Sequence, residues 1–297
     1  MKTIKQIAII GPTASGKTGA SIALAQRANA IIVSLDSLSI FKEIDIASAK
    51  PTLLERKGVE HFGIDEIYPN EAFDVTHFIK LYQKAYDYAL SLQKPLIIVG
   101  GSSFYLKMLL DGISPLPTIS ADTHIKVQMA LKDLSKSYQM LHQLDKEYMQ
   151  QIAPSDRYRI EKALAIYFQT HLAPSHYFAK HPPQSVIAHE LPIYSIATDR
   201  EILRQRIRLR THTMIEAGLI DEVCYLEQKY TRTPHSMKSI GIKETLDYLD
   251  GRYTKDGLIE AIITHTAQLA KRQNTFNRSQ FNRTIVVSLE ELYRLEV

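Results

Sequence analysis

The segment Gly11-Pro12-Thr13-Ala14-Ser15-Gly16-Lys17-Thr18 constrains the fold of this chain more than any other. Its spacing is Gly-x4-Gly-Lys-Thr, and it lies between an apolar run at 5–10 and a stretch at 17–28 that is typical of a helix. In that setting backbone N–H groups turn inward around phosphate oxygens, while the helix N-terminus and Lys17 add positive charge. The motif predicts a phosphate-binding P-loop, but it does not identify the molecule that carries the phosphate.

Short β-branched runs alternate with helical patterns along both ends of the chain, which favours a parallel sheet covered by helices on both faces. We expect strands at 5–10, 30–34, 95–99, 191–197 and 284–287, and a helix at 75–92. The fold class predicted is therefore α/β, a P-loop NTPase-like sheet.

The middle of the chain has little strand signal. Helical patterns at 122–144, 147–152 and 156–171 are separated by prolines. We therefore predict that residues 1–116 and 190–297 form the P-loop α/β catalytic core, and that residues 117–189 form an all-helical insertion domain.

Composition limits the setting in which the protein works. No apolar run is long enough to span a bilayer, and the N-terminus lacks the features of a signal peptide. Cys224 is the single cysteine, which fits the reducing cytoplasm, and its apolar helical context predicts a packed side chain. The net charge of +4 permits a nucleic-acid partner without establishing one. We expect a cytoplasmic protein that does not bind membranes.

Two further loops are expected at the edge of the sheet that carries the P-loop. Asp36 ends the run at 30–34, so its side chain enters the crevice at the carboxyl ends of the strands. There it can hold Mg²⁺, accept a proton from a nucleophile, or cap the next segment. Gly100 and Gly101 precede Ser102 in a second loop, which is either an anion site or a tight turn with a serine cap.

Two basic segments have alternative interpretations. Arg206 and Arg210 share a helical face, where they repel unless an anion such as diphosphate lies between them; the alternative is a solvated face paired with acids. In the segment 268–278, a face carrying Gln268, Arg272 and Thr275 suits a phosphate backbone, and the alternative is an exposed helix end that favours cations.

The order of these segments resembles the bacterial tRNA dimethylallyltransferase (isopentenyl-diphosphate:tRNA transferase) family over nearly the whole chain. The segments that carry the resemblance are the P-loop, Ser34–Ser37 running through Asp45–Pro51, Gly100–Leu106, Gly112–Pro117, Arg206–Arg210, Ser239–Gly241, and Ala270–Gln273 with Thr275. The resemblance implies transfer of a dimethylallyl group from dimethylallyl diphosphate to N6 of the adenosine 3′-adjacent to the anticodon, tRNA position 37. Diphosphate is released, and the substrates are tRNAs reading codons that begin with U. It also implies Mg²⁺ as cofactor, a monomer, and an insertion that embraces the anticodon stem-loop.

The resemblance assigns roles to individual residues. Asp36 would accept the N6 proton, Arg210 would neutralise the leaving diphosphate, and Thr18 would hold Mg²⁺. The diphosphate-binding residues would be Gly11, Pro12, Thr13, Ala14, Ser15, Gly16, Lys17, Thr18 and Arg210. The tRNA-binding residues would be Asp36, Ser37, Leu38, Ser39, Ser102, Tyr158, Arg159, Ile160, Glu161, Lys162 and Arg272.

Two other functions use the same P-loop. A small-molecule kinase would use Asp36 as base or Mg²⁺ ligand, and it would need an adenine-binding surface and a lid arginine. A non-catalytic RNA-binding protein would have no need of the intact set Lys17, Thr18, Asp36 and Arg210.

Overall fold

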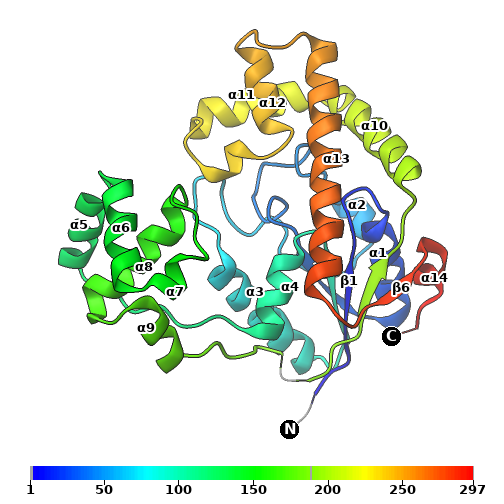
Figure 1. Ribbon diagram of the computed structural model, residues 1–297. Helices are drawn as coiled ribbons and strands as arrows, with labels where there is room; N and C mark the ends of the chain where they lie inside the picture. The colour runs from blue at the N-terminus through cyan, green and yellow to red at the C-terminus, as the bar shows by residue number, and fades with distance from the viewer. Residues whose placement is uncertain (1–2, 188, 297) are drawn as a thin grey trace. The chain divides into compact units, whose positions relative to one another are not determined.

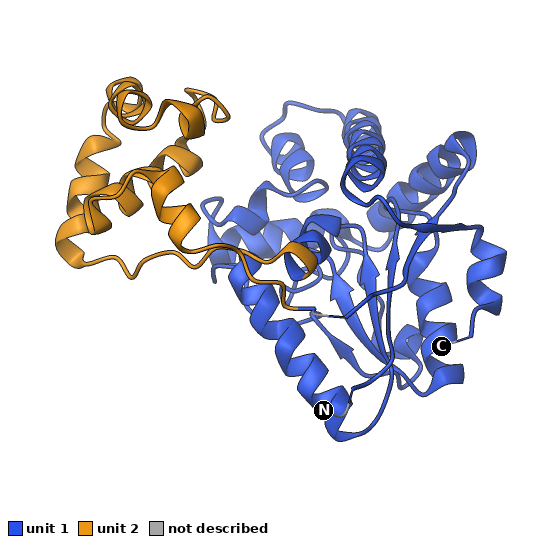
Figure 2. Ribbon diagram, turned by 60° about the horizontal axis from the view of Figure 1, so that its bottom comes forward, with its two compact units in different colours: residues 1–109, 187–297 blue, residues 110–186 orange. Residues whose placement is uncertain are grey.

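The structure is a computed structural model that describes residues 3–187 and 189–296. The chain divides into two compact units, coloured separately in Figure 2. Unit 1 consists of residues 1–109 and 187–297, and unit 2 of residues 110–186. The insertion predicted at 117–189 therefore starts later and ends later than unit 2.

Unit 1 is built on a parallel sheet of six strands. Their spatial order is β3 (His61–Phe62), β2 (Ile31–Leu35), β4 (Leu96–Gly100), β1 (Gln6–Ile10), β5 (Ile193–Ile196) and β6 (Ile285–Val287). The strands expected from the sequence are all present. Strand β3 was not predicted, because two residues are too few to produce a recognisable apolar pattern.

Helices lie on both sides of the strands in Figure 2, which confirms the predicted α/β class. One face of the sheet, including Ile7, Ile9 and Ile97, packs in a buried cluster with α1 (Lys17–Ala28) and α14 (Leu289–Arg294). Helix α3 (Val75–Ser91) packs against β2 and β3. Because successive residues of a strand point to opposite faces, strands buried on both sides are apolar throughout.

The remaining helices follow β2, β4 and β5 along the chain (Figure 1). They are α2 (Leu53–Arg56), α4 (Ser103–Asp111), α10 (Arg200–Glu216), α11 (Leu219–Tyr230), the 3-10 helix η1 (His235–Lys238), α12 (Ile242–Leu249) and α13 (Lys255–Gln280). Helices α10 and α13 pack together through Leu203, Ile207 and Ile263. Cys224 on α11 is exposed, so the prediction that it is packed was wrong; the buried face of α11 carries Val223 and Leu226 instead.

Unit 2 contains α5 (Ala121–Ala130), α6 (Leu134–Leu144), α7 (Lys146–Met149), α8 (Arg157–Thr170) and α9 (Pro174–Lys180). The single helix expected at 122–144 is broken, because the Asp133 carboxylate accepts the Lys136 N–H at 2.9 Å and starts a new helix there. Val127, Leu141 and Ile160 belong to the core of this unit.

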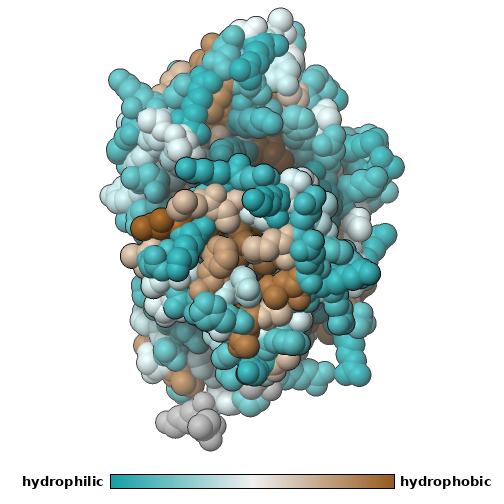
Figure 3. Space-filling view, turned by 60° about the vertical axis from the view of Figure 1, so that its left-hand side comes forward, coloured by the Kyte–Doolittle hydropathy of each residue, from teal (hydrophilic) through white to brown (hydrophobic). Residues whose placement is uncertain are grey.

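The surface mixes hydrophilic residues with apolar areas, as the face in Figure 3 shows. Ile125, Met129 and Tyr158 of unit 2 are among the large side chains that are exposed. Among residues 3–187 and 189–296, none of the helices combines the length and the apolar character that a membrane span needs.

Candidate active site

Three loops meet at the carboxyl edge of the sheet because the strands that precede them end in register. Ile10 of β1 is paired with Gly100 of β4 and with Ser195 of β5, and Gly100 is also paired with Leu35 of β2. The P-loop, the segment from Asp36 and the segment from Gly101 therefore begin side by side. Gly100 itself is required here, since a Cβ on it would lie 2.3 Å from the Leu35 carbonyl oxygen.

The P-loop delivers free N–H groups to the cavity above it. Gly16 has a φ of 90° and precedes α1 without any side-chain cap, so the first N–H groups of the helix remain available to an anion. The residues Thr13 to Thr18 line a cavity of about 310 Å³, which we call the P-loop cavity. Gly11 and Pro12 are buried and do not line it.

Lys17 is the buried cation of this cavity, with 7% of its surface exposed. Its Nζ donates to the Pro12 carbonyl oxygen and to Ser15 Oγ, the latter at 3.2 Å. Burial lowers the pKa of Lys17 to about 7; the charge of Asp36 opposes this shift, and that of Arg210 adds to it. A diphosphate would restore the full charge of Lys17, because a nearby anion favours the protonated amine.

Helix α10 contributes two arginines to the same cavity. Arg206 Nη1 donates to the Ser15 carbonyl oxygen at 3.3 Å, and Arg210 contacts Thr13 Oγ1 at 3.5 Å and the Ser48 carbonyl oxygen at 3.4 Å. Burial lowers the pKa of Arg210, and Asp36 opposes that shift. These long contacts are with neutral groups, and among the described residues neither guanidinium group forms an ion pair, although the charge of Asp36 acts on Arg210. Both groups are therefore available to an anion.

Asp36 lies directly after β2 and starts a turn rather than a helix. Its Oδ1 accepts the N–H groups of Leu38 at 2.8 Å and of Ser39 at 3.0 Å, which fixes the carboxylate. No donor in the described part of the chain binds Oδ2. Local capping and a chemical role are therefore compatible in this residue, because each uses a different oxygen.

A second cavity, of about 330 Å³, adjoins the P-loop cavity. Five residues line both cavities: Thr13, Asp36, Ser48, Arg210 and Gln273. We call the second space the adjoining cavity; Ser37, Leu38, Ser102, Ser239 and Ile240 also line it. Asp36 is thus reached from two sides, one of which carries the phosphate-binding groups.

Comparison with known proteins decides the family. A profile described as IPP transferase matches residues 39–280. The chain belongs to the IPP transferase family. A tRNA dimethylallyltransferase of Sulfurovum sp. (strain NBC37-1) is 59% identical over 98% of this chain and 97% of its own length.

Solved structures of the IPP transferase family have the same fold. The full-length tRNA isopentenylpyrophosphate transferase from Bacillus halodurans matches with a TM-score of 0.71 at 28% identity, over 98% of this chain and 93% of that one. A structure described as a eukaryotic dimethylallyltransferase acting on tRNA matches with a TM-score of 0.84 at 25% identity, over 96% of this chain and 74% of that one.

In this member of the IPP transferase family, sequence reasoning missed Gln273. Gln273 Oε1 accepts the Thr13 N–H at 2.8 Å, and a Cβ on Gly101 would lie 2.4 Å from its Nε2. The amide therefore closes the P-loop against the Gly101 loop. The helical pattern of 268–278 favoured the face of Gln268, Arg272 and Thr275; which face meets the P-loop depends on how α13 docks, and the pattern alone does not reveal that.

The segment Asp45–Pro51, which carries part of the family resemblance, is held in place by acidic residues. Glu222 accepts the N–H groups of residues 45, 46 and 47 at 2.7–3.0 Å. Lys50 has a buried side chain that pairs with Asp45 at 2.6 Å and with Asp65. This support positions Ser48 beside Arg210, and Lys50 on the wall of the P-loop cavity.

The other residues predicted to bind tRNA are dispersed. Ser102 lines the adjoining cavity, and Ser39 lines the P-loop cavity, whereas Arg272 is exposed on α13 and lines neither. Residues 158–162 lie on α8 of unit 2. The side chain of Ile160 is fully buried in the core of that unit, where it packs with Val127 and Leu164, and is not available to RNA. Contact between the segment 158–162 and RNA stays a prediction.

Proposed function

We propose that the chain transfers the dimethylallyl group of dimethylallyl diphosphate to N6 of adenosine 37 in tRNAs reading codons that begin with U. The products are N6-(dimethylallyl)adenosine and diphosphate. The observation that carries this proposal is the position of Asp36, whose carboxylate borders both the cavity with the buried cations and the adjoining cavity.

Departure of diphosphate is assisted by charges already fixed in the P-loop cavity. Negative charge develops on the bridging oxygen as the allylic C–O bond breaks, and Lys17, Arg210 and the N-terminus of α1 stabilise it. Arg206 lies on the same side of α10 and serves the outer oxygens of the diphosphate.

The residues of the P-loop cavity also suit Mg²⁺. The Thr18 hydroxyl lines the cavity, and Mg²⁺ in such sites takes one or two protein oxygens together with phosphate oxygens. In the described residues there is no group of three or more His, Cys, Asp or Glu side chains that could hold a metal ion by itself. When bound by Thr18 and the diphosphate, the ion would neutralise charge on the leaving group.

The nucleophile is a weak one, and Asp36 compensates for this. The lone pair of the adenine N6 amine is delocalised into the ring, so the amine must lose a proton as the C–N bond forms. Oδ2 of Asp36 is free to accept that proton while Oδ1 stays bound to the turn. The base has to leave its stack to reach Asp36, and in a single-stranded anticodon loop that movement is inexpensive.

The tRNA is proposed to contact residues of both units. Asp36, Ser37, Leu38, Ser102 and the adjoining cavity receive the base, and the exposed part of α8, including Tyr158 and Arg159, faces the anticodon stem-loop. Action as a monomer is part of this proposal. The cytoplasm is the compartment in which such a tRNA-modifying enzyme would meet its substrate.

The decisive experiment incubates the protein with unmodified tRNA, Mg²⁺ and labelled dimethylallyl diphosphate, without ATP. We expect label in the tRNA at N6 of adenosine 37, identified by mass spectrometry of nucleosides. A tRNA with guanosine at position 37 is the matched control and should stay unlabelled. ATP turnover with a small acceptor, and no labelling of tRNA, would replace this proposal by a kinase.

A further inference from the structure

Part of the wall of the adjoining cavity is a turn with a left-handed backbone conformation. Ser239 and Ile240 line the cavity, and Gly241 follows them with a φ of 93° immediately before α12. Residues with a side chain rarely adopt such a conformation, so the turn needs glycine here. The position of Ser239 and Ile240 in the cavity therefore depends on the groups that hold Gly241.

The Glu244 carboxylate is one of these groups. Its Oε2 accepts the Gly241 N–H at 2.7 Å, and Thr245 Oγ1 donates to the Gly241 carbonyl oxygen at 2.6 Å. Glu244 is 2% exposed, and within the described residues it forms no ion pair with a lysine or an arginine. Burying a carboxylate is costly unless its oxygens are hydrogen-bonded. The second oxygen of Glu244 therefore needs a partner as well.

His265 of α13 is that partner. Its Nδ1 donates to Glu244 Oε1 at 2.6 Å, and its side chain is 39% exposed. His265 comes three residues after Ile262 and four before Leu269, so the three lie on neighbouring positions of one helical face. Ile262 and Leu269 line the adjoining cavity, as does Gln273, which contacts the P-loop. The Glu244 carboxylate thus joins the turn before α12 to the helix that supports the P-loop.

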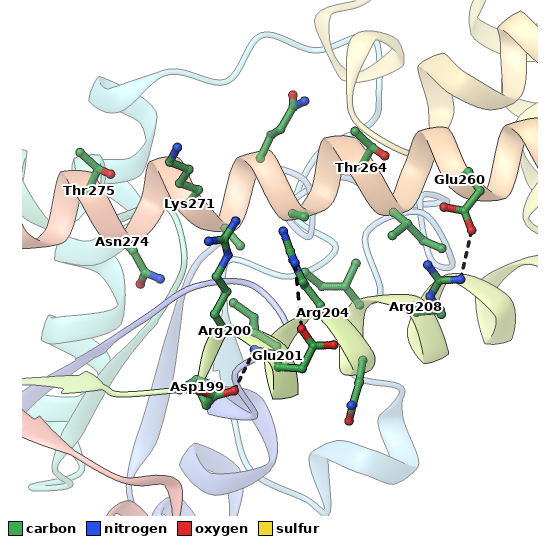
Figure 4. Close-up of a pocket in the computed structure, with 18 of the residues that line it drawn as sticks. Asp199, Arg200, Glu201, Arg204, Arg208, Glu260, Thr264, Lys271, Asn274 and Thr275 are labelled. Carbon is green, nitrogen blue, oxygen red and sulfur yellow. Dashed lines mark hydrogen bonds and ion pairs between the residues drawn. The ribbon is translucent and has the colours of Figure 1, made fainter.

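Another face of α13 has different surroundings. In Figure 4, Thr264 and Lys271 of this helix line a groove of about 990 Å³ beside α10, where Glu260 pairs with Arg208 at 3.2 Å. The groove and the adjoining cavity have one lining residue in common, Ile207. A substitution of the histidine that binds Glu244 should therefore change the adjoining cavity and leave the contacts between α10 and α13 in place.

Two other helices of this chain begin with the same arrangement of a glutamate and an N–H group, but their glutamates are exposed. Glu55 of α2 accepts the Thr52 N–H and Glu291 of α14 accepts the Ser288 N–H, both at 2.7 Å. Both carboxylates are exposed, and among the described residues neither is hydrogen-bonded to a second element. Capping a helix start therefore does not require a buried glutamate. The burial of Glu244 and its bond to α13 indicate a further role.

We propose that Glu244 and His265 are positioning residues for adenosine 37. They hold Ser239 and Ile240 in place as the part of the adjoining cavity that receives the base. Neither Glu244 nor His265 lines the cavity, so both act through the turn at 239–241. This inference rests on the proposed function, which places the base in the adjoining cavity.

The test measures the binding of two anticodon stem-loop RNAs to the full-length protein, one with adenosine at position 37 and one with an abasic residue there. The ratio of the two Kd values isolates the contribution of the base. We expect the unaltered protein to prefer adenosine by about tenfold. Glu244→Ala and His265→Ala should lose most of this preference, because the Gly241 N–H or the buried carboxylate is left without its partner.

Glu244→Gln is the conservative variant and should keep the preference. Its amide oxygen still accepts the Gly241 N–H, and its NH₂ group donates to Nδ1 of His265 in the tautomer that carries the proton on Nε2. If Glu244→Ala fails to fold, His265→Ala carries the test, because it alters a partly exposed side chain. Glu55→Ala removes the exposed glutamate of α2, which lines neither cavity, and is the matched control.

Binding of inorganic diphosphate separates positioning from a general loosening of the fold. Its Kd should be the same in all these variants, because the P-loop cavity is unaltered. An undiminished preference for adenosine in both alanine variants would overturn the inference, as would an equal loss in Glu55→Ala or a loss of diphosphate binding in His265→Ala. If the unaltered protein itself shows no preference for adenosine, the proposed function is contradicted together with the inference, so the two failures are distinguishable.

Discussion

At the scale of single residues, the candidate site depends on the two oxygens of the Asp36 carboxylate and on the charge of Lys17. Oδ1 of Asp36 holds the turn at 37–39, and the second oxygen is left to the cavities. Lys17 is buried enough that its charge is incomplete near neutral pH without a ligand. A substitution at Asp36 can therefore remove the free oxygen and keep the one that holds the turn, and a substitution at Lys17 can remove the titrating charge.

Asp36→Asn keeps the oxygen that accepts the N–H groups of Leu38 and Ser39 but removes the base. We expect the turnover number for prenyl transfer to fall by a factor on the order of 10²–10⁴, with little change in melting temperature. Single-turnover labelling of tRNA at saturating substrate measures the effect. An unchanged turnover number would remove Asp36 from the role of base.

Lys17 predicts a pH dependence of diphosphate binding. Its pKa is about 7 in the free protein and rises when an anion binds, so binding takes up a proton above pH 7. Affinity should be independent of this group below pH 7 and should fall by up to about tenfold per pH unit above it. Calorimetry with inorganic diphosphate at pH 6.5, 7.5 and 8.5 tests this, with Lys17→Met as reference for the titration of diphosphate itself. A constant affinity ratio between the two proteins across these pH values would contradict it.

At the scale of elements, the loop after β4 is fixed by two different close approaches. Gly100 faces the backbone of Leu35, and Gly101 faces the end of the flexible Gln273 side chain. A backbone cannot withdraw from a new methyl group, whereas a side-chain amide can turn aside. Substitutions at adjacent glycines should therefore have different consequences.

Gly100→Ala should destabilise the fold by about 1–3 kcal/mol, the usual cost of overpacking, seen as a lower melting temperature. Gly101→Ala should melt nearly normally but bind diphosphate about tenfold more weakly, because the displaced amide no longer accepts the Thr13 N–H. Gln273→Ala is the comparison for the second variant. Normal diphosphate binding by Gly101→Ala alongside a defect in Gln273→Ala would show that the amide is not displaced.

The sequence allowed five of the strands of unit 1 to be predicted closely, because strands buried on both faces are apolar and the P-loop fixes the first turn. It did not reveal the break at 131–133, where Asp133 starts a helix inside a continuous apolar pattern. On α10, Arg206 and Arg210 meet the P-loop and form no ion pair among the described residues, while Arg208 pairs with Glu260; an anion between Arg206 and Arg210 stays a prediction. Gln273 was missed because a helical pattern gives the faces of α13 but not their neighbours.

At the scale of the whole molecule, the two cavities with Asp36 lie in unit 1, and unit 2 supplies α8. In that helix Ile160 fills the core of the unit, while Tyr158 and Arg159 are exposed and Lys162 lies 5.3 Å from the Tyr158 ring centroid. An exposed ring beside cations is suited to RNA, through stacking and phosphate contacts. Substitutions in unit 2 should therefore change the KM for tRNA, and substitutions in the P-loop cavity of unit 1 the binding of the diphosphate substrate.

The double variant Tyr158→Ala/Arg159→Ala should raise the KM for tRNA by about tenfold and leave the KM for dimethylallyl diphosphate unchanged. Steady-state kinetics with each substrate varied in turn measures both values. Lys126→Ala removes a cation of unit 2 that pairs with Asp122 and serves as the control. An equal rise in the control would attribute the effect to net charge instead of to α8.

The P-loop begins at residue 11, yet its supports come much later in the chain. Gln273 binds Thr13 across 260 positions, Leu289 lies against Gly16, and Tyr293 and Leu295 accept hydrogen bonds from Arg27 of α1. During synthesis on the ribosome the first motif to emerge is thus the last to be completed. A nascent or truncated chain has the motif without these supports, so we expect its phosphate-binding loop to become ordered only once the C-terminal segment has been made.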